Sequence, residues 1–380
     1  MAQAPQSGTT PVSVRPGAGQ IPSGRGGGLD ALRFLASLLI VLYHYGSEAP
    51  TPLDQLHPVF ARGFLATDFF LMLSGYVLGQ AYGAQVLSGR IGTGRFLVKR
   101  LTRLWPGQAI MLVALAVVVG LSAAAGFAPA HPDHFTLRAF WMQLFLIQSL
   151  GVEGGAGWNM PSWSLSALLV CYAIFPLAWR WISQVHNRVL PILFGLTCIL
   201  CGDLICRRVM GHAISDLPLH LGVLRAVPLF TLGVCIARTV QQGAPPLRVA
   251  RDTAWAAAVA LVVLQMIGRL DMASIVAIAA LVLAWGRLPV RNPSAVIESA
   301  AKLSFALFIT HTLSGLVWFG VTNVVERRLH TAQPIDWLLW ALAFPFALIM
   351  AGLFHRFVDE PVQAWLAPRL APRRVRPLTT

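Results

Sequence analysis

The sequence has few charged residues for its length. Only 12% of its 380 residues are Asp, Glu, Lys or Arg, whereas 56% are hydrophobic. Soluble domains carry about 25% charged residues, so a soluble fold is excluded. The alternating ten-residue segments of membrane β-barrels are also missing. Because lipid offers the backbone no hydrogen-bond partners, the sequence predicts an all-α, polytopic membrane helix bundle.

Cysteine is also scarce, and its placement argues against a metal centre. The five cysteines are odd in number and all lie within apolar runs, at Cys171, Cys198, Cys201, Cys206 and Cys235. A thiol in such a run behaves as a small hydrophobic group. No histidine or acidic cluster accompanies the three neighbouring cysteines of 198–206, so the sequence predicts no metal site.

Acidic residues are fewer than basic ones, and the formal net charge is +14. Such an excess can indicate nucleic-acid binding, but no basic soluble domain is present to bind it. In membrane proteins, Lys and Arg concentrate in cytoplasmic loops and set the topology. We therefore predict no nucleic-acid partner and use the charges to orient the helices.

Eleven apolar segments follow a Gly-, Pro- and Ser-rich stretch at residues 1–28, which we expect to be a disordered cytoplasmic tail. They cover residues 29–46, 63–84, 104–127, 135–150, 163–183, 188–206, 221–240, 252–268, 272–288, 303–325 and 335–355. The weakest is 135–150, which is short and contains Gln143 and Gln148. If it does not cross the membrane, 20 of the 29 Lys and Arg residues lie on the cytoplasmic side and 7 on the outer side.

If 135–150 does cross, this asymmetry disappears. The positive-inside rule therefore predicts about ten transmembrane helices with both termini in the cytoplasm. It makes 135–150 a re-entrant or interfacial helix on the outer face. The membrane domain is expected to cover 29–366, followed by a basic cytoplasmic tail at 367–380.

The first span, LDALRFLASLLIVLYHYG at 29–46, contains Arg33 and His44. Eleven residues make about three helical turns, so both side chains lie on one face and about 16 Å apart. Arg33 is then near the cytoplasmic boundary and His44 near the outer one. Ionisable residues within spans usually mark function. Snorkelling of Arg33, its pairing with Asp30, and an interfacial position for His44 are the structural alternatives.

Two further polar features lie next along the chain. In GFLATDFFLMLSGY at 63–76, Asp68 has a depth comparable to that of His44. We expect Asp68 to accept a hydrogen bond from the His44 ring and to orient it as a general base, although a polar helix–helix contact is an alternative. In RFLVKRLTRLWP at 95–106, four basic residues form one broad helix face, which indicates either phosphate binding or anchoring to anionic lipid: Arg95, Lys99, Arg100 and Arg103.

Six blocks of the sequence, taken in order, resemble the bacterial acyltransferase-3 family. They are LDALRFLASLLIVLYHYG, GFLATDFFLMLSGYVLG, RFLVKRLTRLWP, WSLSALLVCYAIFPL, SFALFITHTL and RFVDEPVQAWL. The resemblance covers residues 29 to 366. Members are integral-membrane enzymes that O-acylate polysaccharides and other acceptors with cytoplasmic acyl-CoA.

The resemblance implies roles for individual residues. His44 matches the histidine regarded as catalytic, and Arg33 matches the arginine that precedes it with ten residues in between. Arg100 and Arg103 match the arginine pair important for donor handling. We add Lys99 and Arg95 to the donor site from local charge alone. The block residues Asp68, His311 and Glu360 also match, whereas Leu168 stands where members usually have a glutamate.

The expected function is therefore O-acyl transfer, most simply of acetyl from acetyl-CoA, in the bacterial inner membrane. CoA phosphates would bind Arg100 and Arg103, with Arg33 at the channel mouth. His44 would act as base or acyl carrier. The acceptor, a polysaccharide or lipid-linked oligosaccharide, is expected near GWNMPSWSLS at 157–166, with these candidate contacts: Trp158, Trp163, Ser164, Arg225 and His311.

Only 15 residues follow Trp365, so we expect the form of the enzyme without an appended hydrolase-like domain, as in exopolysaccharide O-acetyltransferases. Two other functions fit a helical bundle with buried His, Asp and Arg. One is a secondary transporter of a small anionic solute, against which the lack of an inverted repeat argues. The other is a non-catalytic subunit of polysaccharide assembly, which the missing glutamate would favour.

Overall fold

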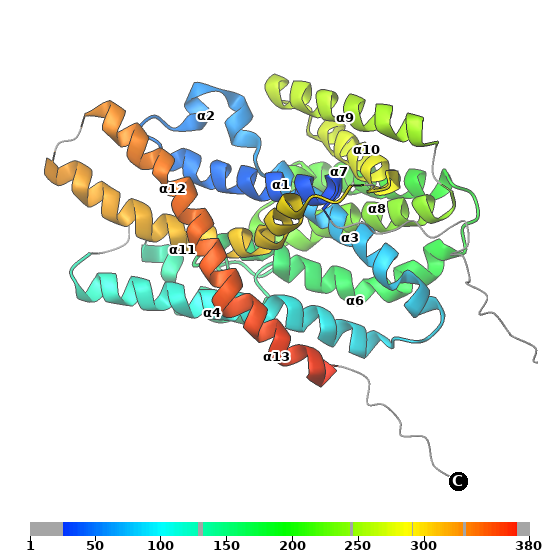
Figure 1. The fold of residues 1–380 in the computed structure, drawn as a ribbon, viewed down its shortest axis with the longest axis horizontal. Coiled ribbons are helices and arrows are strands. Elements are labelled where there is room, and N and C mark those ends of the chain that lie inside the picture. The colour runs from blue at the N-terminus through cyan, green and yellow to red at the C-terminus, as the bar shows by residue number, and fades with distance from the viewer. Residues whose placement is uncertain (1–25, 128–131, 244–245, 291, 330–331, 371–380) are drawn as a thin grey trace, which may run out of the picture.

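The computed structural model describes residues 26–127, 132–243, 246–290, 292–329 and 332–370 (Figure 1). Within these ranges the chain forms helices and connecting loops with no strand, as the composition predicts. The α-helices are α1 (Gly28–Tyr45), α2 (Leu53–Leu56), α3 (Leu65–Leu87), α4 (Thr93–Ala124), α5 (Leu137–Leu144), α6 (Trp163–Ser183), α7 (Leu190–Met210), α8 (Gly222–Gln241), α9 (Leu247–Ile267), α10 (Asp271–Arg287), α11 (Ala295–Leu329), α12 (Gln333–Phe354) and α13 (Glu360–Leu370).

Eight helical segments are long and apolar enough to cross a membrane, counted over the described part of the chain. They contain α1, α3, α4, α6, α7, α8, α11 and α12, so the protein is a multi-pass membrane protein. The prediction that 135–150 does not span is confirmed, because α5 has only 8 residues and is about 12 Å long. The other two predicted spans form α9 and α10, which are not among the eight. The count of ten and the cytoplasmic termini stay predictions.

The two predicted tails fall largely outside the described residues. Residues 1–25 and 371–380 are not described. Of the predicted tail at 367–380, the first four residues form the last turn of α13.

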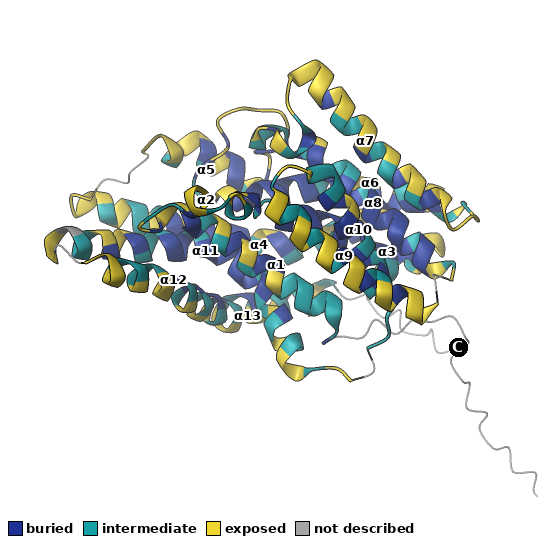
Figure 2. Ribbon diagram, turned by 90° about the horizontal axis from the view of Figure 1, so that it is seen from above, coloured by how far each residue is buried: buried dark blue, intermediate teal, exposed yellow. Residues whose placement is uncertain are grey.

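The centre of the bundle is a close contact between α3 and α8, which lie side by side (Figure 1). Gly75 of α3 and Gly233 of α8 make this contact possible. A Cβ atom at Gly75 would overlap the carbonyl of Phe230, and one at Gly233 would overlap the carbonyl of Met72. Small residues let membrane helices approach backbone to backbone. Figure 2 accordingly shows α8 largely buried, whereas α7 and α9 carry exposed outer faces.

This contact gives a first prediction. Gly233→Ala should destabilise the purified protein by about 1–3 kcal/mol, because the added methyl group must push two backbones apart. Thermal unfolding in detergent measures the effect. The matched control is Gly120→Ala on α4, where a new Cβ meets no atom within 4 Å. Equal melting temperatures for the two variants would contradict the role given to Gly233.

The helix α4 contains a proline, and the C-terminal helix completes its hydrogen bonding. Pro106 has no N–H, so the carbonyl of Thr102 lacks its helical donor. Gln363 Nε2 of α13 donates to that carbonyl at 3.1 Å. The chain reaches this position through a π-helical turn at His355–Asp359, between α12 and α13. This turn and α13 therefore pack against the basic half of α4.

Candidate active site

His44 lies in the last turn of α1, an apolar helix that ends just beyond it at Tyr45. Its ring atom Nδ1 is 2.9 Å from the carbonyl oxygen of Ile40, one turn earlier. A carbonyl only accepts, so Nδ1 carries the hydrogen and donates it. In the neutral ring, Nε2 then keeps its lone pair. His44 can therefore accept a proton at Nε2 without any acidic partner.

A second histidine faces His44 from α11. The ring centroids of His44 and His311 are 5.0 Å apart. His311 is buried, and its Nδ1 is 3.2 Å from the carbonyl of Leu307, which fixes the same tautomer. Its Nε2 has no hydrogen-bond partner among the described residues. The hydroxyl of Tyr45 donates to the His311 carbonyl at 2.8 Å and ties α1 to α11.

The expectation that Asp68 orients His44 is wrong. Asp68 is fully buried in α3, and its Oδ1 accepts from Nε of Arg225 in α8 at 2.7 Å. Its Oδ2 has no hydrogen-bond partner in the described part of the chain. A charged arginine stabilises a buried carboxylate more than a neutral imidazole ring would. The pair holds α3 and α8 together at the level of their first turns.

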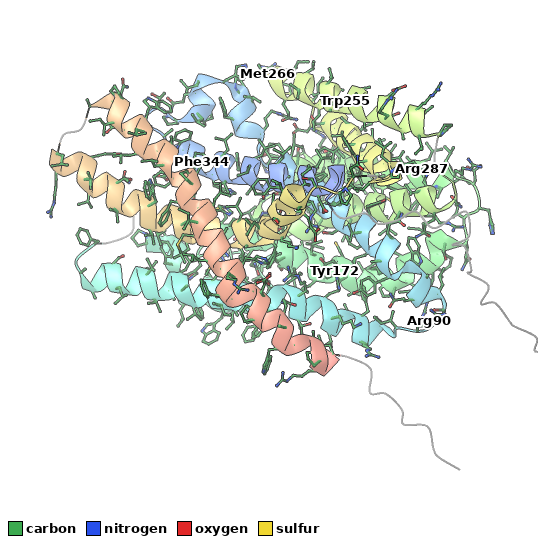
Figure 3. All side chains as sticks on the ribbon, in the orientation of Figure 1. Arg90, Tyr172, Trp255, Met266, Arg287 and Phe344 are labelled. Carbon is green, nitrogen blue, oxygen red and sulfur yellow. The ribbon has the colours of Figure 1, made fainter. Side chains whose placement is uncertain are left out.

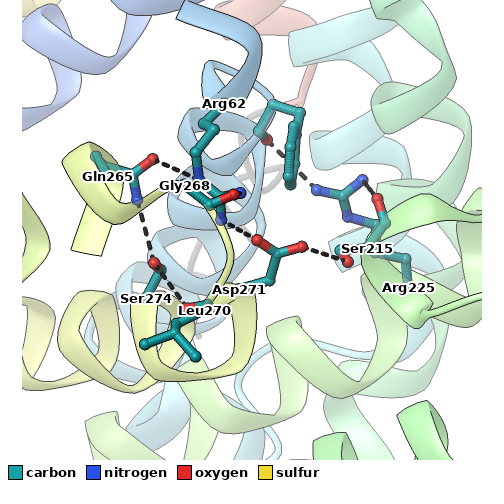
Figure 4. A network of polar contacts seen from close by, with 9 residues as sticks. Arg62, Ser215, Arg225, Gln265, Gly268, Leu270, Asp271 and Ser274 are labelled. Carbon is teal, nitrogen blue, oxygen red and sulfur yellow. Dashed lines mark hydrogen bonds and ion pairs between the residues drawn. The ribbon is translucent and has the colours of Figure 1, made fainter. Parts of the chain in front are cut away.

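Arg225 was predicted to bind an anionic sugar, but its donors are engaged within the protein. Besides Asp68, it donates to the carbonyl of Ser215 at 2.8 Å and to that of Phe64 at 3.5 Å. Ser215 Oγ in turn donates to Asp271 at 2.9 Å (Figure 4). These contacts leave no free guanidinium nitrogen, and they do not support substrate binding by Arg225.

The same network continues through a second buried arginine, which the sequence reading did not single out as functional. Arg62 donates to Asp271, to the carbonyl of Gly268 at 2.7 Å, and to Gln265 at 3.3 Å (Figure 4). It therefore connects the loop before α3 to α9 and α10. We interpret the network as structural.

The opposite end of α1 carries the predicted donor residues. Arg33 is half-exposed and lies 3.5 Å from Asp30, as an i, i+3 pair. It also lies within electrostatic range of Arg103 of α4. Arg103 donates to Asp359 of the π-helical turn at 2.5 Å and lies 5.0 Å from the centre of the Phe305 ring. Arg33 and Arg103 thus bring positive charge from two helices to the same end of the bundle.

The other predicted donor residues differ in their surroundings. Arg100 donates to the hydroxyl of Tyr82 at 2.6 Å and stacks over that ring at 4.7 Å. The buried Tyr172 of α6 (Figure 3) lies within electrostatic range of both Arg100 and Arg103. Arg95 is exposed and donates to the carbonyl of Leu370 at 3.0 Å. Lys99 lies half-buried on the same helix.

The predicted acceptor stretch precedes α6, and its aromatic faces contact other protein groups. Trp158 Nε1 donates to the carbonyl of Thr136 at 2.9 Å, and its ring packs edge-on against Phe135 and Phe140. Trp163 is buried beside Arg225, and Ser164 bonds back to the carbonyl of Pro161. These contacts hold the loop in place. They leave Trp163 no open face for a sugar.

Two buried amide side chains, Asn159 and Gln108, were not predicted as site residues from the sequence. Asn159, within that same stretch, donates from Nδ2 to Gln108 Oε1 of α4 at 3.0 Å and to the carbonyl of Ile309 of α11 at 3.3 Å. Its backbone N–H donates to Gln143 at 3.0 Å. Gln108 could have been identified from the sequence, because it is an amide side chain inside an otherwise apolar span. Leu168, in place of the usual glutamate, is buried as well.

Comparison with known proteins identifies the family. The profile of the acyltransferase-3 family, described as an acyltransferase domain, matches residues 27–356. The acyltransferase MdmB of Streptomyces mycarofaciens is 25% identical over 90% of this chain and 92% of its own length. Protein 2 in the picA locus of Rhizobium radiobacter is 32% identical over 45% of this chain and 90% of its own.

A further relative, named as the membrane-bound transacylase BcsY of Komagataeibacter xylinus, is 25% identical over 64% of this chain and 58% of its own length. No solved structure matches the chain. The family profile covers most of the residues, and acyl transfer, not solute transport, is the activity of such a domain. The chain belongs to the acyltransferase-3 family and is a multi-pass membrane acyltransferase that transfers groups other than aminoacyl groups.

Proposed function

We propose that the protein transfers an acyl group, most simply acetyl, from cytoplasmic acyl-CoA to a hydroxyl of a cell-surface or exopolysaccharide sugar. The observation that carries this proposal is the tautomer of His44. Its Nδ1 is held by the Ile40 carbonyl, which leaves Nε2 free to act as a base. The basic residues at the other end of the same helix supply the complementary donor site.

The donor end is suited to the phosphates of CoA. Arg33 lies within electrostatic range of Arg103, and a phosphate bound by both would accept a charge-assisted hydrogen bond from each. Asp30 and Asp359 each pair with one of these arginines, whereas Arg100 has no carboxylate partner among the described residues and leaves a positive charge at this end. Arg33 and His44 are about 16 Å apart along α1, which an extended pantetheine arm can span. The thioester then reaches the histidines while the nucleotide stays at the basic end.

The chemical step is a transesterification. His44 Nε2 takes the proton of the acceptor hydroxyl as its oxygen attacks the thioester carbonyl carbon. The carbon–sulfur bond breaks, and the departing thiolate of CoA recovers the proton from the imidazolium. If Nε2 attacks the thioester instead, an acyl-histidine forms first. Quenching the enzyme with labelled acetyl-CoA in the absence of acceptor distinguishes the two, because only the second route leaves label on the protein.

We assign the enzyme to the cytoplasmic membrane, with the Arg33 end facing the cytoplasm and the His44 end facing outward. The excess of Lys and Arg in the loops at the Arg33 end supports this orientation. CoA is thereby bound on the side where it is made, and the sugar on the side where the polymer is exposed.

The proposal is tested with purified protein, acetyl-CoA and the polysaccharide from a strain lacking the gene. We expect CoA release that depends on the polymer, together with acetyl ester on the polymer by mass analysis. In cells, deletion of the gene should remove this ester, and the wild-type gene should restore it. A protein that binds acetyl-CoA but never releases CoA would contradict the proposed function.

The donor site gives a quantitative prediction. Arg103→Gln is expected to raise KM for acetyl-CoA about 10- to 100-fold, because a charged hydrogen bond contributes about 1.5–3 kcal/mol. In the single variant, the carboxylate of Asp359 is left without its partner. The double variant Arg103→Gln/Asp359→Asn removes this charge and should show the same KM for acetyl-CoA as Arg103→Gln. Arg90→Gln, an exposed arginine after α3, is the matched control. Equal KM values for Arg103→Gln and the control would show that lipid anchoring, not donor binding, is the role of Arg103.

A further inference from the structure

Two buried amide side chains carry polar atoms that no protein group satisfies. Gln108 and Asn159 have no exposed surface. The Ile309 carbonyl only accepts, so the nitrogen of Asn159 must face it, and this contact in turn sets the orientation of Gln108. Gln108 Nε2 and Asn159 Oδ1 are then left without a hydrogen-bond partner among the described residues.

Such atoms are uncommon in folded proteins and are costly. Most buried polar groups are paired, and an unpaired one costs about 1–3 kcal/mol. The neighbouring amide of Gln143 shows the usual arrangement. Its nitrogen donates to Gly155 and its oxygen accepts from Asn159. Gln108 and Asn159 therefore need a partner that is not part of the folded chain.

The amide pair lies at the depth of the histidines. Arg103 and Phe305 are in contact and mark a common level on α4 and α11. Gln108 is five residues beyond Arg103, and His311 is six residues beyond Phe305, which corresponds to about 7.5 Å and 9 Å along the two helices. The two helices run in the same direction (Figure 1). The amides are thus level with His311, whose ring faces that of His44.

The chemistry of the two atoms identifies the class of ligand. One is an unpaired donor, and the other an unpaired acceptor. They belong to side chains that are hydrogen-bonded to each other, so they are close together. A hydroxyl group complements both, because it accepts one hydrogen bond and donates another. A carboxylate or phosphate would leave the acceptor Asn159 Oδ1 unsatisfied. The amides are also uncharged, which favours a neutral ligand.

We propose that Gln108 and Asn159 form a subsite for a sugar hydroxyl of the acceptor, adjacent to the hydroxyl that reacts at His44. This inference rests on the proposed function. It makes the amide pair part of acceptor recognition and assigns it no part in donor binding. A buried water also donates and accepts, so the experiment must separate a substrate subsite from a structural water.

The test is steady-state kinetics of Gln108→Met with acetyl-CoA and the unacylated polysaccharide of a strain lacking the gene. We expect KM for the polymer to rise at least about 10-fold, since a hydrogen bond to a buried partner is lost. KM for acetyl-CoA should stay within about 2-fold. Gln108→Glu is the second variant, because it keeps the oxygen that faces Asn159 and replaces the unpaired NH₂ donor with an acceptor oxygen. The matched control is Gln80→Met, whose amide donates to the carbonyl of Ala237.

The outcomes are distinct. An unchanged KM for the polymer in both Gln108 variants means that the amides hold a water only, and it overturns the subsite. A parallel rise in both KM values also overturns it, because Gln108 would then act on the donor. Wild-type enzyme that transfers nothing to the polymer contradicts the proposed function itself. Unchanged binding of acetyl-CoA to each variant, measured by equilibrium dialysis, establishes that the variant is folded.

Discussion

His44→Ala is expected to lower kcat for acyl transfer about 10³-fold or more, with the dissociation constant for acetyl-CoA nearly unchanged. General-base catalysis contributes about 10²–10⁴-fold, and alanine also removes the only group in the last turn of α1 that can take the proton. The donor contacts lie about 16 Å away at Arg33 and are left intact. Stopped-time assays of CoA release, beside equilibrium binding of acetyl-CoA, measure the two quantities separately.

The control for this variant is His212→Ala. His212 is exposed and lies 4.0 Å from Asp216, outside the histidine pair. It should retain wild-type turnover. If His44→Ala binds the donor and keeps full turnover as well, His44 is not the base, and the partly satisfied His311 becomes the next group to replace.

The largest effect on stability is expected from Arg225→Leu. Removing one partner of a buried ion pair costs about 3–5 kcal/mol, because the remaining charge is neither paired nor hydrated. Asp68 has no exposed surface and already has one oxygen without a partner. Loss of Arg225 therefore leaves a bare carboxylate between α3 and α8. Unfolding in detergent, followed by helical circular dichroism, measures the change.

The double variant Arg225→Leu/Asp68→Asn decides between a structural and a catalytic role for Asp68. Removing both charges should recover most of the lost stability, because neither is left buried alone. Turnover per folded molecule should recover with it. A stable double variant without activity would return Asp68 to the catalytic site. Asp252→Asn, at an exposed pair with Arg251, is the control and should change stability by less than about 1 kcal/mol.

The architecture could be predicted because lipid leaves the backbone few choices. Apolar length located the helices, and 163–183 matches α6 at both ends. The charge balance correctly excluded 135–150 as a span. The start of α4 was harder to predict, because the amphipathic residues 93–103 belong to the same helix as the apolar residues that follow them. A hydropathy profile treats the amphipathic and the apolar residues as two segments, although they form one continuous helix.

The partners of the polar residues were harder to predict, because they depend on which helices pack together. Asp68 and Arg225 were each noticed as charges at the outer end of a span, yet each was assigned to a substrate or a histidine. Opposite charges at one depth could have been paired from sequence alone. The tautomer of His44 could not be predicted from sequence. Every helical residue has a carbonyl one turn earlier, and only the side-chain rotamer decides whether the ring donates to it.

The contacts that complete the site join distant parts of the chain. The bond from Tyr45 to His311 spans 266 residues, that from Arg103 to Asp359 spans 256, and that from Gln363 to Thr102 spans 261. During synthesis, α1 and α4 enter the membrane long before their partners are translated. The nascent chain therefore lacks the histidine pair until α11 is made, and it lacks the ion pair of Arg103 until the π-helical turn after α12 is made. A chain that ends between α11 and this turn therefore contains both histidines but lacks the carboxylate partner of Arg103.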